Sequence, residues 1–190
     1  MREIHFIKMR GLDNDFVVID NRARKIRLDI KDKKMIADRR KGIGCDQILI
    51  INQKSGVDEI EMQIFNADGS EAEACGNGAR CVASYLMDDL GTSEVKIKTV
   101  AGKLKAYRES SGLVKVNMGN PSFDWKKIPL AMDCDTLAVP LNIQFLDDPV
   151  CLSMGNPHAV FIVEDADLVN IEAIGPEVEQ HPIFPNKTNV

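Results

Sequence analysis

Cys75 is the residue around which the chemistry of this sequence is organised. It follows the polar turn Asn66–Ser70 and a Glu-Ala-Glu-Ala run, and the triplet Gly76-Asn77-Gly78 comes directly after it. A helix is predicted to begin at this triplet, so the thiol would lie among N–H groups that have no partner within the helix. These N–H groups and the helix macrodipole favour negative charge, which lowers the pKa of a thiol. We therefore predict that Cys75 forms a thiolate.

The helix after Cys75 is indicated by the spacing of its apolar residues. They recur on one face of a helix with about 3.6 residues per turn, and they are Ala79, Val82, Ala83, Leu86, Met87 and Leu90. Gly91 stands where a left-handed C-terminal cap is expected. Because glycines also flank Asn77, the backbone at the helix start can approach a ligand closely, and its N–H groups can hold a substrate carboxylate.

A buried, inert thiol is the alternative interpretation of Cys75. The neighbouring residues argue against it, because a core cysteine belongs to an apolar period and Cys75 lies between acidic residues and glycines. Cys81 lies inside the predicted helix, where packing is the expected role. The spacing of the two cysteines does not match a zinc site, and no second Cys/His pair follows at the required distance.

The composition is that of an ordinary globular protein, with 44% hydrophobic and 28% charged residues and a net charge of −5. Acidic and basic residues are mixed along the chain, which argues against a nucleic-acid-binding protein or a membrane-surface protein. We expect no signal peptide and no membrane span. Five cysteines, an odd number at irregular spacing, fit a reducing compartment. The predicted localisation is cytoplasmic.

Apolar and alternating runs predict strands on both sides of the central helix. They cover residues 3–9, 16–20, 48–51, 59–64, 95–100, 103–107 and 113–118, and a weak helix is expected over 30–40. A hairpin with Asn14 and Asp15 at its bend connects the first two strands. These elements predict an α+β fold, in which a mainly antiparallel sheet wraps around a central helix.

The distribution of proline predicts two domains. All eight prolines lie from Pro121 onward, so we place an N-terminal domain at 1–118 and the beginning of a second domain at 119–190. Residues 129–149 have a linker-like composition, and 159–163 form a strand. Val190 has the character of an unfinished strand, so we expect the second domain to be incomplete.

Three polar residues lie in loops where binding side chains are common. Asn14 is in the first turn, Gln47 at a junction of loop and strand, and His158 beside a proline before a strand. Each has a structural alternative. Asn14 can serve turn geometry alone, Gln47 can be a solvated loop residue, and His158 can be a hydrogen-bonded structural histidine. Local sequence favours the structural alternative for Asn14 and His158 and leaves both interpretations of Gln47 open.

Taken together, five segments resemble the diaminopimelate epimerase family, in the family's order and over essentially the whole chain. They are residues 6–16, 42–47, 65–70, 75–81 and 154–158. The resemblance implies a cofactor-independent, metal-free epimerase that interconverts LL- and meso-2,6-diaminopimelate in lysine and peptidoglycan precursor synthesis. It also implies two similar domains, each contributing one cysteine, with a thiolate and a thiol on opposite faces of the α-carbon.

The resemblance also implies roles for individual residues. Cys75 matches one catalytic acid/base, and His158 matches a residue that tunes the cysteine pair. The amides of Gly76 and Asn77 would hold the α-carboxylate. The remaining substrate contacts are amide side chains, which can bind a doubly zwitterionic ligand without adding net charge: Asn14, Gln47, Asn66, Asn156 and Asn189.

Some family features are absent from these residues. The second half of the family carries another Cys-Gly-Thr/Ser-Gly motif, which does not occur here, and Asp13 stands where glycine is common. We therefore expect the 190-residue chain alone to be inactive. Two alternatives remain open: a racemase or isomerase of the same fold acting on another small amino acid, and a non-catalytic fragment or binding module. The expected partner is the small-molecule substrate, without nucleic acid or membrane, and a homodimer is left open.

Overall fold

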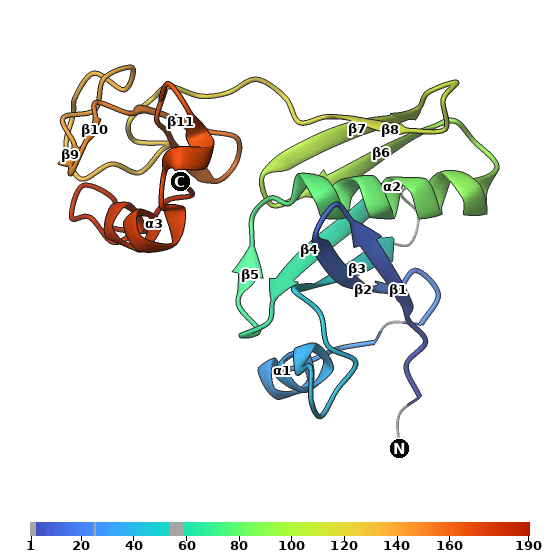
Figure 1. Ribbon diagram of the computed structural model, residues 1–190. Coiled ribbons are helices and arrows are strands. Elements are labelled where there is room, and N and C mark those ends of the chain that lie inside the picture. Colours follow the sequence, from blue (N-terminus) through green and yellow to red (C-terminus); the bar gives the residue numbers. More distant parts are fainter. Residues whose placement is uncertain (1–2, 25, 54–58) are drawn as a thin grey trace. The chain divides into compact units, whose positions relative to one another are not determined.

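The structure is a computed structural model that describes residues 3–24, 26–53 and 59–190 (Figure 1). The chain divides into two compact units, Met1–Gly119 and Asn120–Val190. The boundary predicted from the proline distribution lies one residue before this division.

One mixed sheet forms the body of the first unit. Its strands follow the order β1-β2-β3-β4-β6-β7-β8, with β5 paired to β4. The β2–β3 and β4–β6 pairs are parallel, and the other pairs are antiparallel. The strands are β1 (Ile7–Gly11), β2 (Asn14–Asp20), β3 (Gln47–Gln53), β4 (Ile60–Asn66), β5 (Glu71–Ala72), β6 (Glu94–Thr99), β7 (Gly102–Arg108) and β8 (Val114–Asn117). The predicted α+β class with a mainly antiparallel sheet is confirmed.

The helix α2 (Gly76–Leu90) packs its apolar face on this sheet. Cys75 is its N-cap, and Gly91 closes it in the left-handed conformation at φ 63°. Of the six residues predicted to face the core, all but Leu90 are buried. They pack with strand residues such as Phe16, Leu49 and Met62 in a single cluster. The periodicity of the sequence therefore predicted this helix, its start and its end correctly.

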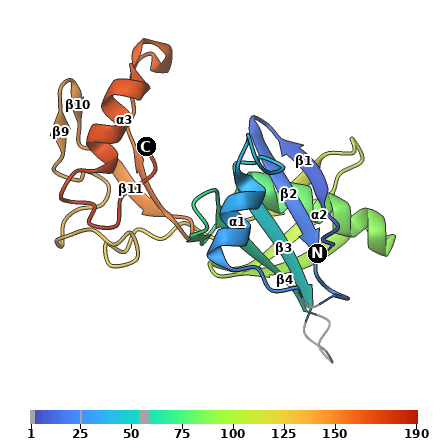
Figure 2. The ribbon, with the colours of Figure 1, turned by 90° about the horizontal axis from the view of Figure 1, so that it is seen from below.

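The opposite side of β2 and β3 is covered by α1 (Ile30–Ala37), so the two helices lie on opposite faces of these strands (Figures 1 and 2). Val17, Ile48 and Phe65 pack in the cluster on the α1 side. Strands covered on both faces cannot have an exposed polar face. This explains why the runs 16–19 and 48–51 are continuously apolar rather than alternating.

The first hairpin differs from the sequence prediction. Its first strand begins at Ile7 rather than Glu3, and Gly11 pairs with Asn14 across a two-residue turn, Leu12-Asp13. Asn14 therefore starts β2 instead of sitting at the bend. The turn is made possible by a positive φ of 55° at Leu12, a conformation that sequence propensity does not predict for leucine.

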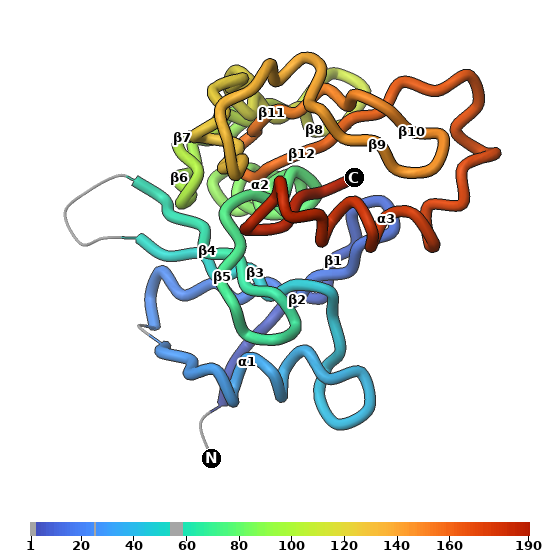
Figure 3. The backbone as a smooth tube through the Cα atoms, turned by 90° about the vertical axis from the view of Figure 1, so that its left-hand side faces the viewer, coloured from blue at the N-terminus to red at the C-terminus, as the bar shows by residue number. Residues whose placement is uncertain are grey.

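The second unit contains short elements around its own core. They are β9 (Asn142–Ile143), β10 (Leu146–Asp147), β11 (Val150–Ser153), β12 (Pro157–Val160), the 3₁₀ helix η1 (Ala166–Leu168) and α3 (Ile171–Glu179). The strands form two separate antiparallel pairs, β9–β10 and β11–β12 (Figure 3).

The linker predicted over residues 129–149 is wrong. Leu130, Val139, Leu141, Ile143 and Leu146 are all buried in the core of the second unit. Proline and turn residues dominate this region, but the apolar side chains between them point inward and supply packing that a solvated linker would not have. Among the described residues, no helix is long and apolar enough to cross a membrane.

Candidate active site

Cys75 lies where the sequence placed it, at the N-cap of α2. Its backbone is extended, with φ −151°, and its Sγ accepts a hydrogen bond from the Gly78 N–H at 3.3 Å. The first turn of α2 contains no acidic residue. The positive end of the helix therefore has a neutral thiol beside it and no carboxylate in its first turn.

The predicted lowering of the Cys75 pKa is wrong in its net direction. Burial raises the pKa of the half-buried Cys75 thiol, because a thiolate is costly away from water. Hydrogen bonds from the Gly78 and Asn77 N–H groups and the charge of Arg80 lower it, but they do not outweigh burial. The helix start therefore lowers the pKa of Cys75 as predicted, but burial raises it by more, and the side chain at rest is a thiol.

The other four cysteines are also thiols whose pKa is raised by burial, and that of Cys151 reaches about 12. Cys45, Cys81 and Cys151 are buried, and Cys134 is partly buried. Among the helices of the described residues, Cys75 is the one of the five cysteines that forms a cap. Its hydrogen bonds to the helix start, rather than its net pKa direction, distinguish it from them.

The glycines around Cys75 have different structural roles. A Cβ on Gly78 would lie 3.1 Å from both methyl carbons of Leu49 and 3.3 Å from the Cys75 Sγ. A side chain at position 78 would therefore require Leu49 to shift by a few tenths of an ångström. A Cβ on Gly76 would meet no atom of the described chain within 4 Å. Packing does not require glycine at position 76, where the backbone faces open space at the helix start.

Two of the predicted amide contacts meet at this helix start. The Nδ2 of Asn77 donates to the Oδ1 of Asn14 at 2.7 Å. The Oδ1 of Asn77 accepts in turn from the guanidinium of Arg80, one helical turn further on. The structure thereby links the first residue of β2 to the first turn of α2.

Two others are neighbours on β3 and β4. Gln47 and Asn66 are paired across the strands, and the Gln47 Nε2 donates to the Asn66 Oδ1 at 3.0 Å. Asn66 Nδ2 donates to the Ser70 Oγ at 3.1 Å, and this hydroxyl donates to the Asp68 carboxylate at 2.5 Å. The hydrogen bonds from Ser70 lower the pKa of Asp68, which keeps it ionised.

These residues share one edge of the sheet. The parallel strands β2 and β3 begin there, because Phe16 pairs with Gln47, and β4 ends there, because Gln47 pairs with Asn66. The turn after Asn66 leads through β5 to Cys75. Asn14, Gln47 and Asn66 are therefore brought to the start of α2 within the first unit.

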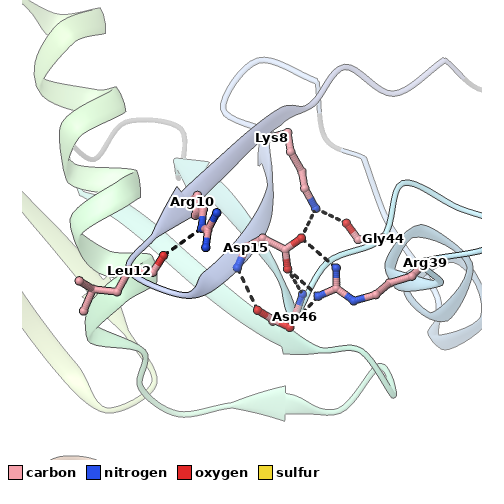
Figure 4. Close-up of polar contacts among 7 residues, drawn as sticks. All are labelled: Lys8, Arg10, Leu12, Asp15, Arg39, Gly44 and Asp46. Carbon is pink, nitrogen blue, oxygen red and sulfur yellow. Dashed lines mark hydrogen bonds and ion pairs between the residues drawn. The ribbon is translucent and has the colours of Figure 1, made fainter.

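A cluster of four charged side chains supports this edge (Figure 4). The Asp15 carboxylate accepts from Lys8 at 2.8 Å and from Arg39 at 2.7 and 3.0 Å, and Arg39 also binds Asp46 at 2.7 Å. Asp15 and Asp46 exchange hydrogen bonds between backbone N–H and carboxylate at 2.9 and 3.0 Å. Chiefly through Arg39, the cluster holds the pKa of Asp15 far below its usual range.

The position of this Asp15 cluster connects it to the site. Asp15 directly follows Asn14, and Asp46 directly precedes Gln47. Fixing the two aspartates to each other therefore fixes the starts of β2 and β3 relative to each other. Asp13 is not part of the cluster, because its side chain is fully exposed and contacts Arg10 of the same turn at 3.3 Å.

The second unit brings its three predicted residues together. His158 Nε2 lies 3.1 Å from the Asn156 Oδ1, and burial lowers the pKa of His158, which favours the neutral imidazole. Asn189 forms an isolated parallel bridge with His158. Its side-chain Nδ2 donates to the Pro157 carbonyl at 2.8 Å.

Sequence reasoning missed the charged partners of these amides. Arg80 lies three residues after Asn77, a helical spacing that would have signalled the contact. Asp68 and Ser70 belong to a turn whose side chains commonly bond to nearby groups. In the described part of the chain, no group of three or more His, Cys, Asp or Glu side chains is arranged to hold a metal ion.

Comparisons with known proteins point in one direction. The family model described as diaminopimelate epimerase matches residues 6–124. A diaminopimelate epimerase from Rhodospirillum centenum is 45% identical over 186 residues, covering 97% of this chain and 64% of the relative. One from a Wolbachia of Drosophila simulans is 42% identical over 188 residues, covering 98% of this chain and 69% of the relative. The chain thus spans about two thirds of the length of these relatives.

Solved structures share the fold at lower sequence identity. A predicted epimerase from Pseudomonas aeruginosa matches with a TM-score of 0.55 and 15% identity, over 92% of this chain and 67% of that one. A phenazine biosynthesis protein of the PhzF family from Bacillus anthracis matches with a TM-score of 0.51 and 20% identity, over 86% of this chain and 56% of that one.

The mixed sheet wrapped on a helix is an α+β fold that this chain shares with these structures. The family match and the close relatives are more specific. This chain belongs to the diaminopimelate epimerase family.

Proposed function

We propose that the full-length protein interconverts LL- and meso-2,6-diaminopimelate without a cofactor, in the synthesis of lysine and peptidoglycan precursors. Family membership supports the reaction. The observation that carries the assignment of the site is Cys75, a hydrogen-bonded thiol at a helix start that has no acidic residue in its first turn.

The reaction requires a weakly acidic α-proton to be removed from one face of the carbon and returned to the other. The charge that develops on the substrate carboxylate can be stabilised by fixed N–H donors such as those of the first turn of α2. Cys75 would give or take the proton on one face. Its Gly78 N–H contact would stabilise the thiolate each time the proton has left.

The proton on the opposite face would come from a second cysteine, in accordance with the two-cysteine mechanism that the family resemblance implies. In the part of the chain that the structure describes, none of the other four cysteines caps a helix, and three of them are buried. We therefore propose that residues 1–190 alone do not catalyse turnover. The five free thiols support a reducing compartment, and we propose the cytoplasm.

The test follows the α-proton in deuterated water. The protein expressed from its full reading frame should incorporate deuterium at the α-carbon and convert LL- into meso-diaminopimelate, whereas a folded polypeptide of residues 1–190 should do neither. Conversion of another amino acid but not of diaminopimelate would overturn the substrate assignment. Turnover by purified residues 1–190 would overturn the need for a second cysteine outside them.

A further inference from the structure

Two chains of hydrogen bonds in the first unit each end on a charged side chain. Arginine can only donate hydrogen bonds, and an ionised carboxylate can only accept them. The groups between them are Asn and Gln amides, whose oxygen and nitrogen exchange places when the amide turns over. A charged end therefore decides which way the amides of its chain must point.

The first chain starts at Arg80. Because the guanidinium donates to Asn77, the atom of Asn77 facing it must be the Oδ1. The Nδ2 of Asn77 is then turned toward Asn14 and donates to its Oδ1 at 2.7 Å. The group that remains on the exposed side chain of Asn14 is its Nδ2, which has no hydrogen-bond partner among the described residues.

The second chain starts at Asp68. Its carboxylate takes the single hydroxyl proton of Ser70, so the Ser70 Oγ must accept from Asn66 Nδ2. A turned-over Asn66 would place two acceptors against each other without a proton between them. The Oδ1 of Asn66 therefore faces Gln47 and accepts from its Nε2 at 3.0 Å. The group that remains at this end is the Gln47 Oε1, an acceptor.

We propose that Arg80 and Asp68 are positioning residues that give the two chains opposite directions, so that Asn14 presents N–H donors and Gln47 presents a carbonyl acceptor. The two ends lie on neighbouring strands, because Gln47 pairs with Phe16, two residues after Asn14. Together they match a carboxylate beside an ammonium group, as in an amino-acid zwitterion. The identity of these ligand groups rests on the proposed function, whereas the donor-to-acceptor direction of the two chains of hydrogen bonds does not.

This arrangement keeps formal charges one or more side chains away from the ligand. Arg80 acts on Asn14 through Asn77, and Asp68 acts on Gln47 through Ser70 and Asn66. Neutral amides can thus distinguish the two charged groups of the ligand. Without the charged ends, either amide could turn over and present the wrong atom.

The first experiment needs no substrate. Neutron diffraction from crystals of the deuterium-exchanged protein shows which side-chain atoms carry deuterium. Deuterons on Asn77 pointing to Asn14, and on Asn66 pointing to Ser70, are expected. Amides pointing the other way would overturn the inference, even if the protein proves to be an epimerase. Expected deuteron positions in a protein without epimerase activity would instead leave the inference standing and overturn the proposed function.

The second experiment measures discrimination in the full-length enzyme. Ser70→Ala breaks the Asp68 chain, Ser70→Thr keeps the hydroxyl, and Ser111→Ala in the β7–β8 turn is the matched control. Ser70→Ala should raise KM for diaminopimelate about tenfold, with a much smaller change in kcat, because one ligand hydrogen bond loses its direction. Ser70→Thr should restore most of the affinity, and Ser111→Ala should change neither constant.

Substrate analogues distinguish whether Ser70 and Arg80 orient the amides or only stabilise the structure. 2-Aminopimelate lacks one of the two amino groups, and pimelate lacks both. Ser70→Ala should weaken inhibition by pimelate less than it weakens binding of diaminopimelate, because pimelate has no ammonium group. Arg80→Met should weaken both by similar factors, because both ligands keep their carboxylates, and Arg80→Lys should partly rescue the loss. Equal losses for both ligands in Ser70→Ala would mean a structural effect and would overturn the proposal.

Discussion

The two long helices of the first unit begin in opposite ways. Asp29 caps α1, and its carboxylate accepts from the Asp32 N–H at 2.8 Å while the Asp32 carboxylate accepts from the Asp29 N–H at 3.1 Å. This capping box satisfies the helix start with groups of the chain itself. At the start of α2, the Gly78 N–H donates to the Cys75 thiol at 3.3 Å, and the first turn contains no acidic residue.

The comparison separates a helix start that is satisfied by its own chain from one that we propose to bind the ligand. At α1 the free N–H groups and the positive end of the dipole are used for stability. At α2 they face a weak thiol acceptor, and the backbone at Gly76 faces open space. We propose that a ligand carboxylate binds there. A helix start that is poorly satisfied by its own chain is therefore the better candidate for a binding site.

The strongest test replaces the cap of α2 by serine. Serine is a good N-cap but a very weak acid, so Cys75→Ser should preserve the free energy of unfolding. Loss of the acid/base should lower the rate of epimerisation by roughly 10²–10⁴-fold in the full-length enzyme. Urea denaturation and α-deuterium exchange measure the two quantities. Retention of activity would show that Cys75 is only a cap.

A second test measures the resting state of the thiol at the open helix start. Because burial raises the pKa of Cys75, iodoacetamide should label it slowly at pH 7. The rate should rise about tenfold per pH unit until the pKa is reached, because the thiolate is the reactive form. Mass-mapped labelling gives the rates for all five cysteines. A labelling rate that is the same at pH 7 and pH 8 would show that Cys75 is already a thiolate at pH 7 and that its pKa is lowered.

A third test compares the two glycines at the start of α2, one that packs against β3 and one that faces open space. Gly78→Ala places a methyl group 3.1 Å from both methyl carbons of Leu49. The overpacking should cost roughly 1–3 kcal/mol, of which the better helix propensity of alanine offsets about 1 kcal/mol, so a net loss of stability is expected. Gly76→Ala meets no atom of the described chain and should leave the unfolding transition unchanged, yet it should raise KM by narrowing the open side of the helix start. An unchanged KM for Gly76→Ala would mean that the ligand does not approach there.

The smallest effect is expected at the start of α1, which the capping box of Asp29 and Asp32 satisfies. Asp29→Ala removes the cap of α1 and should lower the free energy of unfolding by about 1 kcal/mol without changing kcat or KM. Asp29→Asn is the matched control, because asparagine caps nearly as well. A clear loss of activity in Asp29→Ala at unchanged stability would contradict the distinction between the two helices.

The sequence predicted the parts of the fold that depend on local periodicity. The start, end and buried face of α2 follow from residues within one helix, and the sheet strands of the first unit follow from their apolar runs. The core of residues 129–149 was missed because its apolar residues have no regular period and become buried through contacts distant in sequence. The positive φ of Leu12 was missed because it is imposed by hairpin register, not by the preference of leucine.

The candidate site likewise has features that the sequence can predict and features that depend on the folded structure. Family motifs supplied the prediction of Cys75 and the amides as site residues, and this remains a prediction. The contact of Arg80 with Asn77 was missed, although the helical spacing of the two residues could have signalled it. The Asp15 cluster joins residues 8, 15, 39 and 46, and only the folded sheet brings them together. The direction of the Cys75 pKa depends on how much of the thiol is buried, a quantity set by packing that a local sequence motif does not contain.

The half-buried thiol of Cys75 also bears on how the protein withstands oxidants. Peroxides attack thiolates far faster than thiols, and the first product, a sulfenic acid, can proceed to forms that cells cannot reduce. A site that carried a permanent thiolate beside an open helix end would be exposed to this damage whenever it was empty. Because burial keeps Cys75 protonated at rest, the vulnerable form is confined to the moments when a proton is in transfer. Inactivation of the empty enzyme by hydrogen peroxide is accordingly expected to be slower at pH 7 than at pH 9.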